Sequence, residues 1–192
     1  MYSSEDFSDL DKTNFKAYRF PDNSIYYGEV TYVDQENKIV TDPSTLEEEE
    51  RANLKLVRHG PGAQFYGVNQ ASASSQYEGE WVLDKMQGKG AARFSDGSSY
   101  EGEFQDGKFS GLGKFIWKIG HVYIGSWKDG RMEGEGEFKH QDGHILRGTF
   151  ANNYIFDKDI GAYVDPFLSS ENADKFRKDH KIYMNMKNTS PK

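Results

Sequence analysis

The 192-residue chain has 31 acidic and 24 basic residues, and its net charge of −7 argues against nucleic acid as a partner. Hydrophobic residues make up 35% of the chain and aromatic residues 15%, so burial must come from rings laid against glycine rather than from a thick aliphatic core. The absence of cysteine excludes disulfides and thiolate metal sites. No apolar run approaches the roughly 18 residues of a membrane-spanning helix, and the acidic start is not that of a signal peptide.

The chain opens with an acidic extension, residues 1–14, which is followed by the first strand-like segment, Phe20–Val30. We place an insertion at about residues 31–58. Inside it, Ser44-Thr-Leu-Glu47 has the spacing of a capping box, which predicts a short exposed helix directly after it. A longer flexible loop is expected between Gly67 and Gln76, where alanine and serine alternate.

Three tyrosines, Tyr77, Tyr100 and Tyr123, recur 23 residues apart, and their neighbours recur with them. Each begins the pattern Tyr-x-Gly-x-Trp/Phe, and 11 residues after each tyrosine comes Gly-x-Gly. A fixed period of roughly 20–50 residues is typical of repeat proteins, whose stacked units present an extended surface. The Gly-x-Gly pairs are Gly88/Gly90, Gly111/Gly113 and Gly134/Gly136.

A fourth copy begins in register at Leu146–Phe150 and then fades, with Asp157 and Asp159 in place of the glycines. An earlier, less regular copy is Phe20–Val30, which aligns with Phe94–Phe104 and is separated from its Gly-x-Gly by the insertion. The repeats therefore divide the chain into an array at residues 15–156 and a C-terminal tail at residues 157–192.

Apolar residues alternate within each copy, which predicts two strands joined by a hairpin turn. Tyr100, Gly102 and Phe104 share one face, and the turn-forming pairs Asp106-Gly107 and Asp129-Gly130 follow the first strands of two copies. The predicted fold class is all-β: consecutive antiparallel β-hairpins in an elongated, twisted single-layer sheet, with short helices in the insertion and the tail.

Glycine is expected at these positions because it has no Cβ, so that a ring from the neighbouring strand can lie flat over its backbone. A single-layer sheet cannot bury both faces alone. The aromatic face therefore curls upon itself, is covered by the chain's own helix, or takes a partner. The register predicted between the second and third copies pairs Trp117 with Tyr123, Phe115 with Gly125, and Gly113 with Trp127.

The pattern of Tyr-x-Gly-x-Trp/Phe followed by Gly-x-Gly every 23 residues resembles the MORN repeat, the membrane occupation and recognition nexus. The resemblance covers about Phe15 to Phe156. The stretch Lys128–Phe138 is similar to the short axonemal MORN proteins in particular.

The tail is predicted to form a helix from Ser169 to about Met186, because Ala173, Phe176, Tyr183 and Met184 fall near one helical face. Such a helix can cap the open end of the array, which all solenoids require, or it can dock elsewhere. The sequence leaves both alternatives open.

The paired acids of each copy, such as Glu101 and Glu103, have the composition of an acid–base dyad. Because they recur once per repeat on the charged face, we interpret them as solvated side chains. His140 takes a position held by a ring in other copies, so it is predicted to be a packing or groove residue rather than a metal ligand. The other four histidines have no metal-ligand spacing with one another. The Gly-x-Gly pairs lack the third glycine and the helix of a phosphate loop. No catalytic residues, cofactor, metal or small-molecule substrate are therefore expected.

The aromatic stripe allows two interpretations, internal packing or a peptide-binding groove. Large rings contribute much contact area at a low entropic cost, which favours them as partner contacts. The residues predicted to line a partner-binding groove are Tyr100, Phe104, Phe115, Trp117, Tyr123 and Trp127.

The resemblance implies a non-catalytic structural adaptor that binds protein partners in a cytoskeletal assembly, above all the ciliary axoneme, in a radial spoke or the central apparatus. The implied location is the cytoplasm and cytoskeleton, at the axoneme of a cilium or flagellum. The alternative is a peripheral module that tethers a phospholipid membrane to a partner. The basic tail residues favour it and the acidic array counts against it, so membrane contact is expected to be weak at most. Similar repeats also serve as regulatory parts of lipid kinases, but no catalytic domain is recognisable in this sequence.

Overall fold

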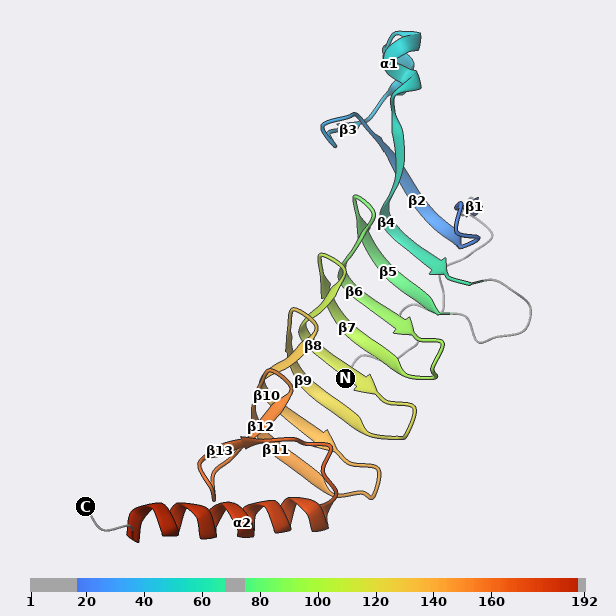
Figure 1. Ribbon diagram of the computed structural model, residues 1–192. Coiled ribbons are helices and arrows are strands. Elements are labelled where there is room, and N and C mark those ends of the chain that lie inside the picture. The colour runs from blue at the N-terminus through green and yellow to red at the C-terminus, as the bar shows by residue number, and fades with distance from the viewer. Residues whose placement is uncertain (1–16, 68–74, 190–192) are drawn as a thin grey trace. The chain divides into compact units, whose positions relative to one another are not determined.

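The computed structural model describes residues 17–67 and 75–189, with side chains in the last helix described as far as Asp179. The predicted acidic extension and most of the predicted loop after Gly67 lie outside these residues. The chain divides into two compact units, Met1–Phe109 and Ser110–Lys192. In each unit successive strands pair as antiparallel hairpins in an open sheet, which confirms the predicted all-β hairpin array (Figure 1).

The first unit has the strand order β1-β2-β4-β5-β6-β7, and β3 pairs with β2. The boundary between the units falls within β8 (Lys108–Ile116). The strands of the first unit are β1 (Ala17–Arg19), β2 (Ile25–Val33), β3 (Ile39–Val40), β4 (Lys55–Phe65), β5 (Gln76–Val82), β6 (Lys85–Arg93) and β7 (Ser99–Gln105).

The insertion between β2 and β4 carries the predicted short helix, α1 (Glu48–Ala52), with no buried side chain (Figure 1). Its capping differs from the prediction, because Glu47 and Glu50 form the capping box of α1. Ser44 instead belongs to a 3-10 turn, Pro43–Thr45, in which the Ser44 N–H donates to the carboxylate of Asp42. The aspartate is the stronger acceptor and lies ahead of the proline, where a helical turn can begin.

The second unit continues from β8 in the order β9-β10-β11-β12-β13, and its chain ends in the helix α2. Strand pairing runs on past residue 156, where the sequence pattern of the repeats ends. The elements are β9 (Val122–Lys128), β10 (Arg131–Lys139), β11 (Ile145–Ala151), β12 (Tyr154–Asp157), β13 (Ala162–Val164) and α2 (Ser170–Thr189).

The two predicted hairpin turns are present. Asp106 and Gly107 have φ of 50° and 78°, and Asp129 and Gly130 have φ of 50° and 80°. Positive φ at both central residues is the geometry of a type I′ turn, whose twist matches that of the flanking strands. The Asp-Gly pairs are therefore confirmed as the residues that set the repeat's turn.

The first glycine of Gly-x-Gly does not have the predicted role of making room for a ring from the neighbouring strand. Gly88 and Gly134 have φ of 65° and 84°, and each lies at a bulge where the register of its hairpin shifts. Because of this bulge, Trp81 faces Met86 rather than Gly88. At Gly88 and Gly134 glycine is thus required by backbone conformation, since L-residues rarely adopt positive φ, and the side chains nearest to a Cβ built there are Glu80 and Ser126 rather than a ring.

The register between β8 and β9 also differs from the predicted one, by two residues. Tyr123 faces Phe115, whereas the prediction set it opposite Trp117. The reason is the connecting turn, in which the Trp117 N–H donates to the His121 carbonyl at 2.9 Å and leaves the strand ladder early. A shift of two keeps every side chain on its predicted face, because faces alternate with a period of two. The observed pairs include Gly111–Trp127, Gly113–Gly125 and Phe115–Tyr123.

The tail of the second unit packs against the sheet of that unit. Pro166 is almost fully buried, and the ring of Phe167 meets Phe138 edge-on at a centroid distance of 5.0 Å. On α2, the Arg177 guanidinium pairs with the carboxylate of Asp157 at 2.5 Å. The described part of the tail is therefore held by both apolar and ionic contacts.

Candidate interaction surface

The repeated tyrosine occupies the space above a pair of glycines. In the hairpin of β5 and β6, Gly79 and Gly90 face each other, and the Tyr77 ring lies over both. A Cβ built on either glycine would lie 2.5–2.6 Å from the Tyr77 side chain, closer than real Cβ atoms approach. For Gly90, which lies on the neighbouring strand, this confirms the predicted reason for glycine.

The tyrosine hydroxyl is bonded within its own strand. Each donates to the backbone carbonyl three residues further on, at 2.8–3.0 Å, so the ring is held at both ends. The same contact in the less regular first copy shows that this copy packs like the others despite its insertion. The donor and acceptor pairs are Tyr26–Glu29, Tyr77–Glu80, Tyr100–Glu103 and Tyr123–Ser126.

The tyrosines and the Trp/Phe rings four residues after them form what we call the aromatic ladder. In the first unit the Tyr77 ring meets Trp81 of its own strand and Phe104 of the next copy, both edge-on at 5.0 and 4.9 Å. In the second unit Tyr123 meets Trp127 and Phe150 in the same way, at 5.2 and 4.9 Å. Edge-to-face contacts at this distance are the favoured arrangement of aromatic pairs.

The indole N–H groups of the ladder also find partners inside the chain. Trp81 Nε1 donates to the Gly62 carbonyl, and Trp127 Nε1 donates to the Gly113 carbonyl, both at 3.2 Å. A buried indole or phenol that is left unpaired is costly, and these bonds supply the partners that the buried indole N–H groups need.

The structure thus places most of the predicted groove residues inside the core. Tyr100, Phe104, Tyr123 and Trp127 are at most 6% exposed. Phe115 and Trp117 are half-buried, and their rings lie 4.5 Å apart. The role of the six as partner contacts stays a prediction, and accessible ring surface is confined to the last two.

Burial raises the pKa of the Tyr77 hydroxyl well above its usual range. A tyrosine that ionises at higher pH in the folded than in the unfolded state contributes stability below about pH 10, which is lost as pH rises further. Tyr77→Phe is therefore expected to reduce the alkaline fall of the unfolding free energy by up to ~1.4 kcal/mol per pH unit. Urea titrations between about pH 9.5 and 11 measure this slope.

The matched control is Tyr154→Phe, because Tyr154 is half exposed on β12. This change removes a hydroxyl that the sheet does not enclose, so it controls for the loss of a tyrosine hydroxyl as such. Equal slopes for the two variants would contradict the enclosed position of the Tyr77 hydroxyl.

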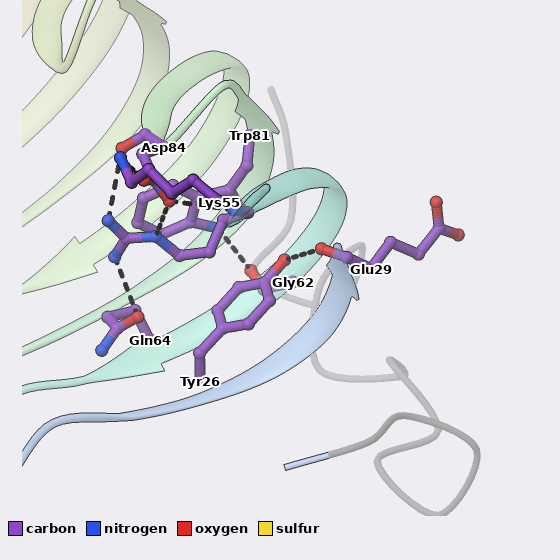
Figure 2. A network of polar contacts seen from close by, with 8 residues as sticks. Tyr26, Glu29, Lys55, Gly62, Gln64, Trp81 and Asp84 are labelled. Atoms are coloured by element: carbon purple, nitrogen blue, oxygen red, sulfur yellow. Dashed lines mark hydrogen bonds and ion pairs between the residues drawn. The ribbon is translucent and has the colours of Figure 1, made fainter. Parts of the chain in front are cut away.

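A second cluster surrounds Arg58 of β4 in the first unit. The guanidinium lies 4.2 Å from the centroid of the Trp81 ring, pairs with Asp84 at 3.0 Å, and donates to the Gln64 amide oxygen at 2.9 Å. Figure 2 shows Asp84 and Lys55 gathered beside Trp81. Burial raises the pKa of the Asp84 carboxyl, but hydrogen bonds from the Arg58 backbone and side chain outweigh this effect and lower it.

We expect Arg58→Ala to destabilise the first unit by about 2–3 kcal/mol, because it strands a partly buried carboxylate and an amide oxygen. Lys55→Ala removes the other cation that contacts Asp84, at 3.2 Å, but Lys55 is 65% exposed and should contribute less than about 1 kcal/mol. Thermal and urea unfolding of the two variants would measure the difference. Equal losses would show that the cluster acts through surface charge alone.

The face opposite the aromatic ladder carries the paired acids and is exposed. In the second unit the Glu137 carboxylate pairs with Arg147 at 2.6 Å, and Glu135 accepts from the Thr149 hydroxyl at 2.5 Å. These cross-strand contacts agree with the interpretation of the acids as surface side chains. The exposed apolar residues between them, which the repeat pattern did not single out, include Leu112 and Ile124.

Aromatic side chains are also exposed on the last strands of the second unit. Tyr154, Phe156 and Tyr163 lie on β12 and β13, and the Phe156 and Tyr163 rings meet at 5.3 Å. These strands follow the last regular repeat, so the period of the array gave no signal for them. Among the described residues, no helix is long and apolar enough to cross a membrane.

Stacked hairpins, a glycine pair under Tyr26, Tyr77 and Tyr123, and an internally satisfied ladder define a β-hairpin repeat protein. The family model for the MORN repeat matches residues 77–99, 100–122 and 123–145. The chain is therefore a MORN-repeat protein with three consecutive MORN repeats. No curated protein matches its sequence. MORN repeats generally take part in protein or membrane interactions, and this family and fold are typically non-catalytic.

Proposed function

We propose that this chain is a non-catalytic structural adaptor that binds protein partners in a cytoskeletal assembly. The observation that carries the proposal is the internally satisfied aromatic ladder. Tyrosine hydroxyls and indole N–H groups are bonded within the chain, so the hairpins are rigid without a bound ligand. A rigid sheet of this kind holds its exposed side chains in fixed positions, which lowers the entropic cost of binding a partner.

The exposed faces supply the contacts that such an adaptor needs. On the outer face of the second unit, Leu112 and Ile124 are 63% and 51% exposed and lie among paired charges. Apolar side chains flanked by charges are suited to a protein surface, where the charges orient the partner and the apolar groups are buried. Catalysis is not part of this proposal, because the acids on this face are engaged with neighbouring strands.

The alternative is a peripheral membrane module that binds through the basic tail. Arg177 is the observation against it, because its guanidinium pairs with Asp157 and Asp174 rather than standing clear of the helix. Exposed Lys175 and Lys178 remain available, and each basic residue near an anionic surface contributes about 1 kcal/mol. Among the side chains that the structure describes, these two lysines on an acidic chain would support marginal attachment only.

We place the assembly in the axoneme of a cilium or flagellum, at a radial spoke or the central apparatus. The similarity of Lys128–Phe138 to the short axonemal MORN proteins supports this location. The cytoplasm and cytoskeleton are the corresponding compartments, and the partners are proteins of that complex.

Detergent extraction of ciliated cells that express the tagged chain separates the two functions. An adaptor stays with the detergent-insoluble axoneme and is seen along it by imaging, whereas a membrane tether is released with the lipid. Lys175→Ala combined with Lys178→Ala, which leaves Arg177 intact, should not change this retention. Release of the parent chain by detergent, together with strong liposome co-sedimentation that the double variant loses, would overturn the proposal in favour of the membrane module.

A further inference from the structure

The turn between β10 and β11 in the second unit, residues 140–144, gathers histidines around one carboxylate. His140 Nδ1 lies 3.0 Å from Asp142 Oδ1, and His144 Nδ1 lies 2.6 Å from the same oxygen. Possible ligand atoms of the three residues all lie within 4.8 Å of one another. The cluster is therefore a group of nitrogen and oxygen donors of the kind that binds a cation.

The turn itself does not need these histidines. Its two backbone bonds, from the His140 N–H to the His144 carbonyl and from the Gly143 N–H to the His140 carbonyl, are both 2.9 Å. The turn Phe94–Ser98 of the first unit makes the same two bonds at 2.9 Å with phenylalanine and serine at the corresponding positions. Aspartate and glycine are common to both turns, so the two histidines add a chemistry that the shared backbone does not require.

The side chains are arranged so that a cation could reach them. The His140 side chain is 6% exposed, the His144 side chain 23% and the Asp142 side chain 43%. The cluster is thus buried at His140 and accessible to solvent at Asp142. Two imidazoles and one carboxylate suit zinc and its neighbours in the first transition series, whereas Mg²⁺ and Ca²⁺ prefer all-oxygen sites.

We propose that His140, Asp142 and His144 bind a divalent transition-metal ion of the Zn²⁺ class, with water completing the coordination. Zinc–nitrogen and zinc–oxygen bonds of about 2.0–2.2 Å set ligand atoms about 3.3 Å apart in a tetrahedral shell. The three donors lie from 2.6 Å to at most 4.8 Å apart, a range that includes this spacing.

Neighbouring groups hold the site in place and connect it to the tail. The Gln141 N–H donates to His121 Nδ1 at 2.9 Å, and the His121 ring lies 4.2 Å from that of His140, which fixes the buried side of the cluster. The Ser170 hydroxyl, at the start of α2, lies 3.1 Å from His144 Nδ1. Because an ion that binds only the folded chain stabilises it, Zn²⁺ should raise the melting temperature of the full chain.

The test is calorimetric titration of the full chain with Zn²⁺, supported by ¹⁵N spectra of the histidine rings. We expect one saturable ion per chain and shifts of the ring nitrogens of His140 and His144. The variant His140→Phe with His144→Ser copies the composition of the turn Phe94–Ser98. It should lose at least about tenfold in affinity, since even indirect supports of a metal site contribute that much.

Asp142→Asn is the second variant, because asparagine keeps the oxygen that accepts the His144 N–H at 3.0 Å while it removes the charge. It should also weaken Zn²⁺ binding about tenfold or more. If the double variant unfolds, this single variant tests the proposed site. His59→Gln, in the first unit, is the histidine control and should leave the affinity unchanged. Absence of saturable binding, or equal affinity in the parent chain and in Asp142→Asn, would overturn the proposal.

Discussion

Trp127→Ala is expected to lower the free energy of unfolding by about 3–5 kcal/mol, the usual cost of removing a large buried ring. Trp127 is 6% exposed, and its ring meets Tyr123 edge-on at 5.2 Å. Its indole also bonds the Gly113 carbonyl, which the truncation leaves without that donor. Urea unfolding of the full chain, followed by tryptophan fluorescence and circular dichroism, would measure the loss.

Trp117→Ala is the matched control, because Trp117 is only half-buried and lies in a turn. It should destabilise the second unit less. If the predicted groove exists at Phe115 and Trp117, this variant should remain folded and weaken partner recovery by ~2 kcal/mol. A folded Trp127→Ala variant of parental stability would contradict the assignment of the ladder to the core.

The hairpin array could be predicted because three signals in the sequence agree. The 23-residue period sets the copies, alternation sets the faces, and Asp-Gly at residues 106–107 and 129–130 sets the turns. Each signal is local, and each follows from backbone geometry that does not depend on distant contacts. The continuation into β13 has no such signal, since the repeat pattern ends at about residue 156.

The register could not be predicted from the same signals. Alternation has a period of two, so a shift of two residues between β8 and β9 leaves the pattern of faces unchanged. The register is determined by the turn in which the Trp117 N–H donates to the His121 carbonyl, and by bulges at glycines such as Gly134. A glycine with positive φ and a glycine beneath a ring look identical in a sequence.

The sequence predicts which rings share a face of the sheet, but it does not predict whether that face is exposed to a partner. Alternation shows that Tyr100 and Phe104 share a face, yet it does not show what covers that face. The Tyr77 ring lies over the glycines of its own hairpin, and the Phe104 ring of the next copy packs against it. The sequence places His140, Asp142 and His144 in one turn, but it does not show that the turn brings their side chains together or that His121 packs against His140.

Gly136→Val is expected to destabilise the second unit by about 3 kcal/mol, the upper end of the usual cost of overpacking. A Cβ at Gly136 would lie 2.5–2.7 Å from the hydroxyl and ring carbons of Tyr123. That ring cannot move aside, because Phe150 packs on it at 4.9 Å and its hydroxyl is bonded to the Ser126 carbonyl. Lys139→Val, on the exposed face of the same strand, adds the same β-branched side chain where nothing encloses it and should change stability by less than about 1 kcal/mol. Thermal unfolding of the two variants compares the same valine side chain at a site closed by a ring and at an open site. The difference measures the steric clash apart from the preference of valine for strands. Equal melting temperatures would mean that the glycine is not required by the ring above it, and the packing rule inferred for every copy of the repeat would fail with it.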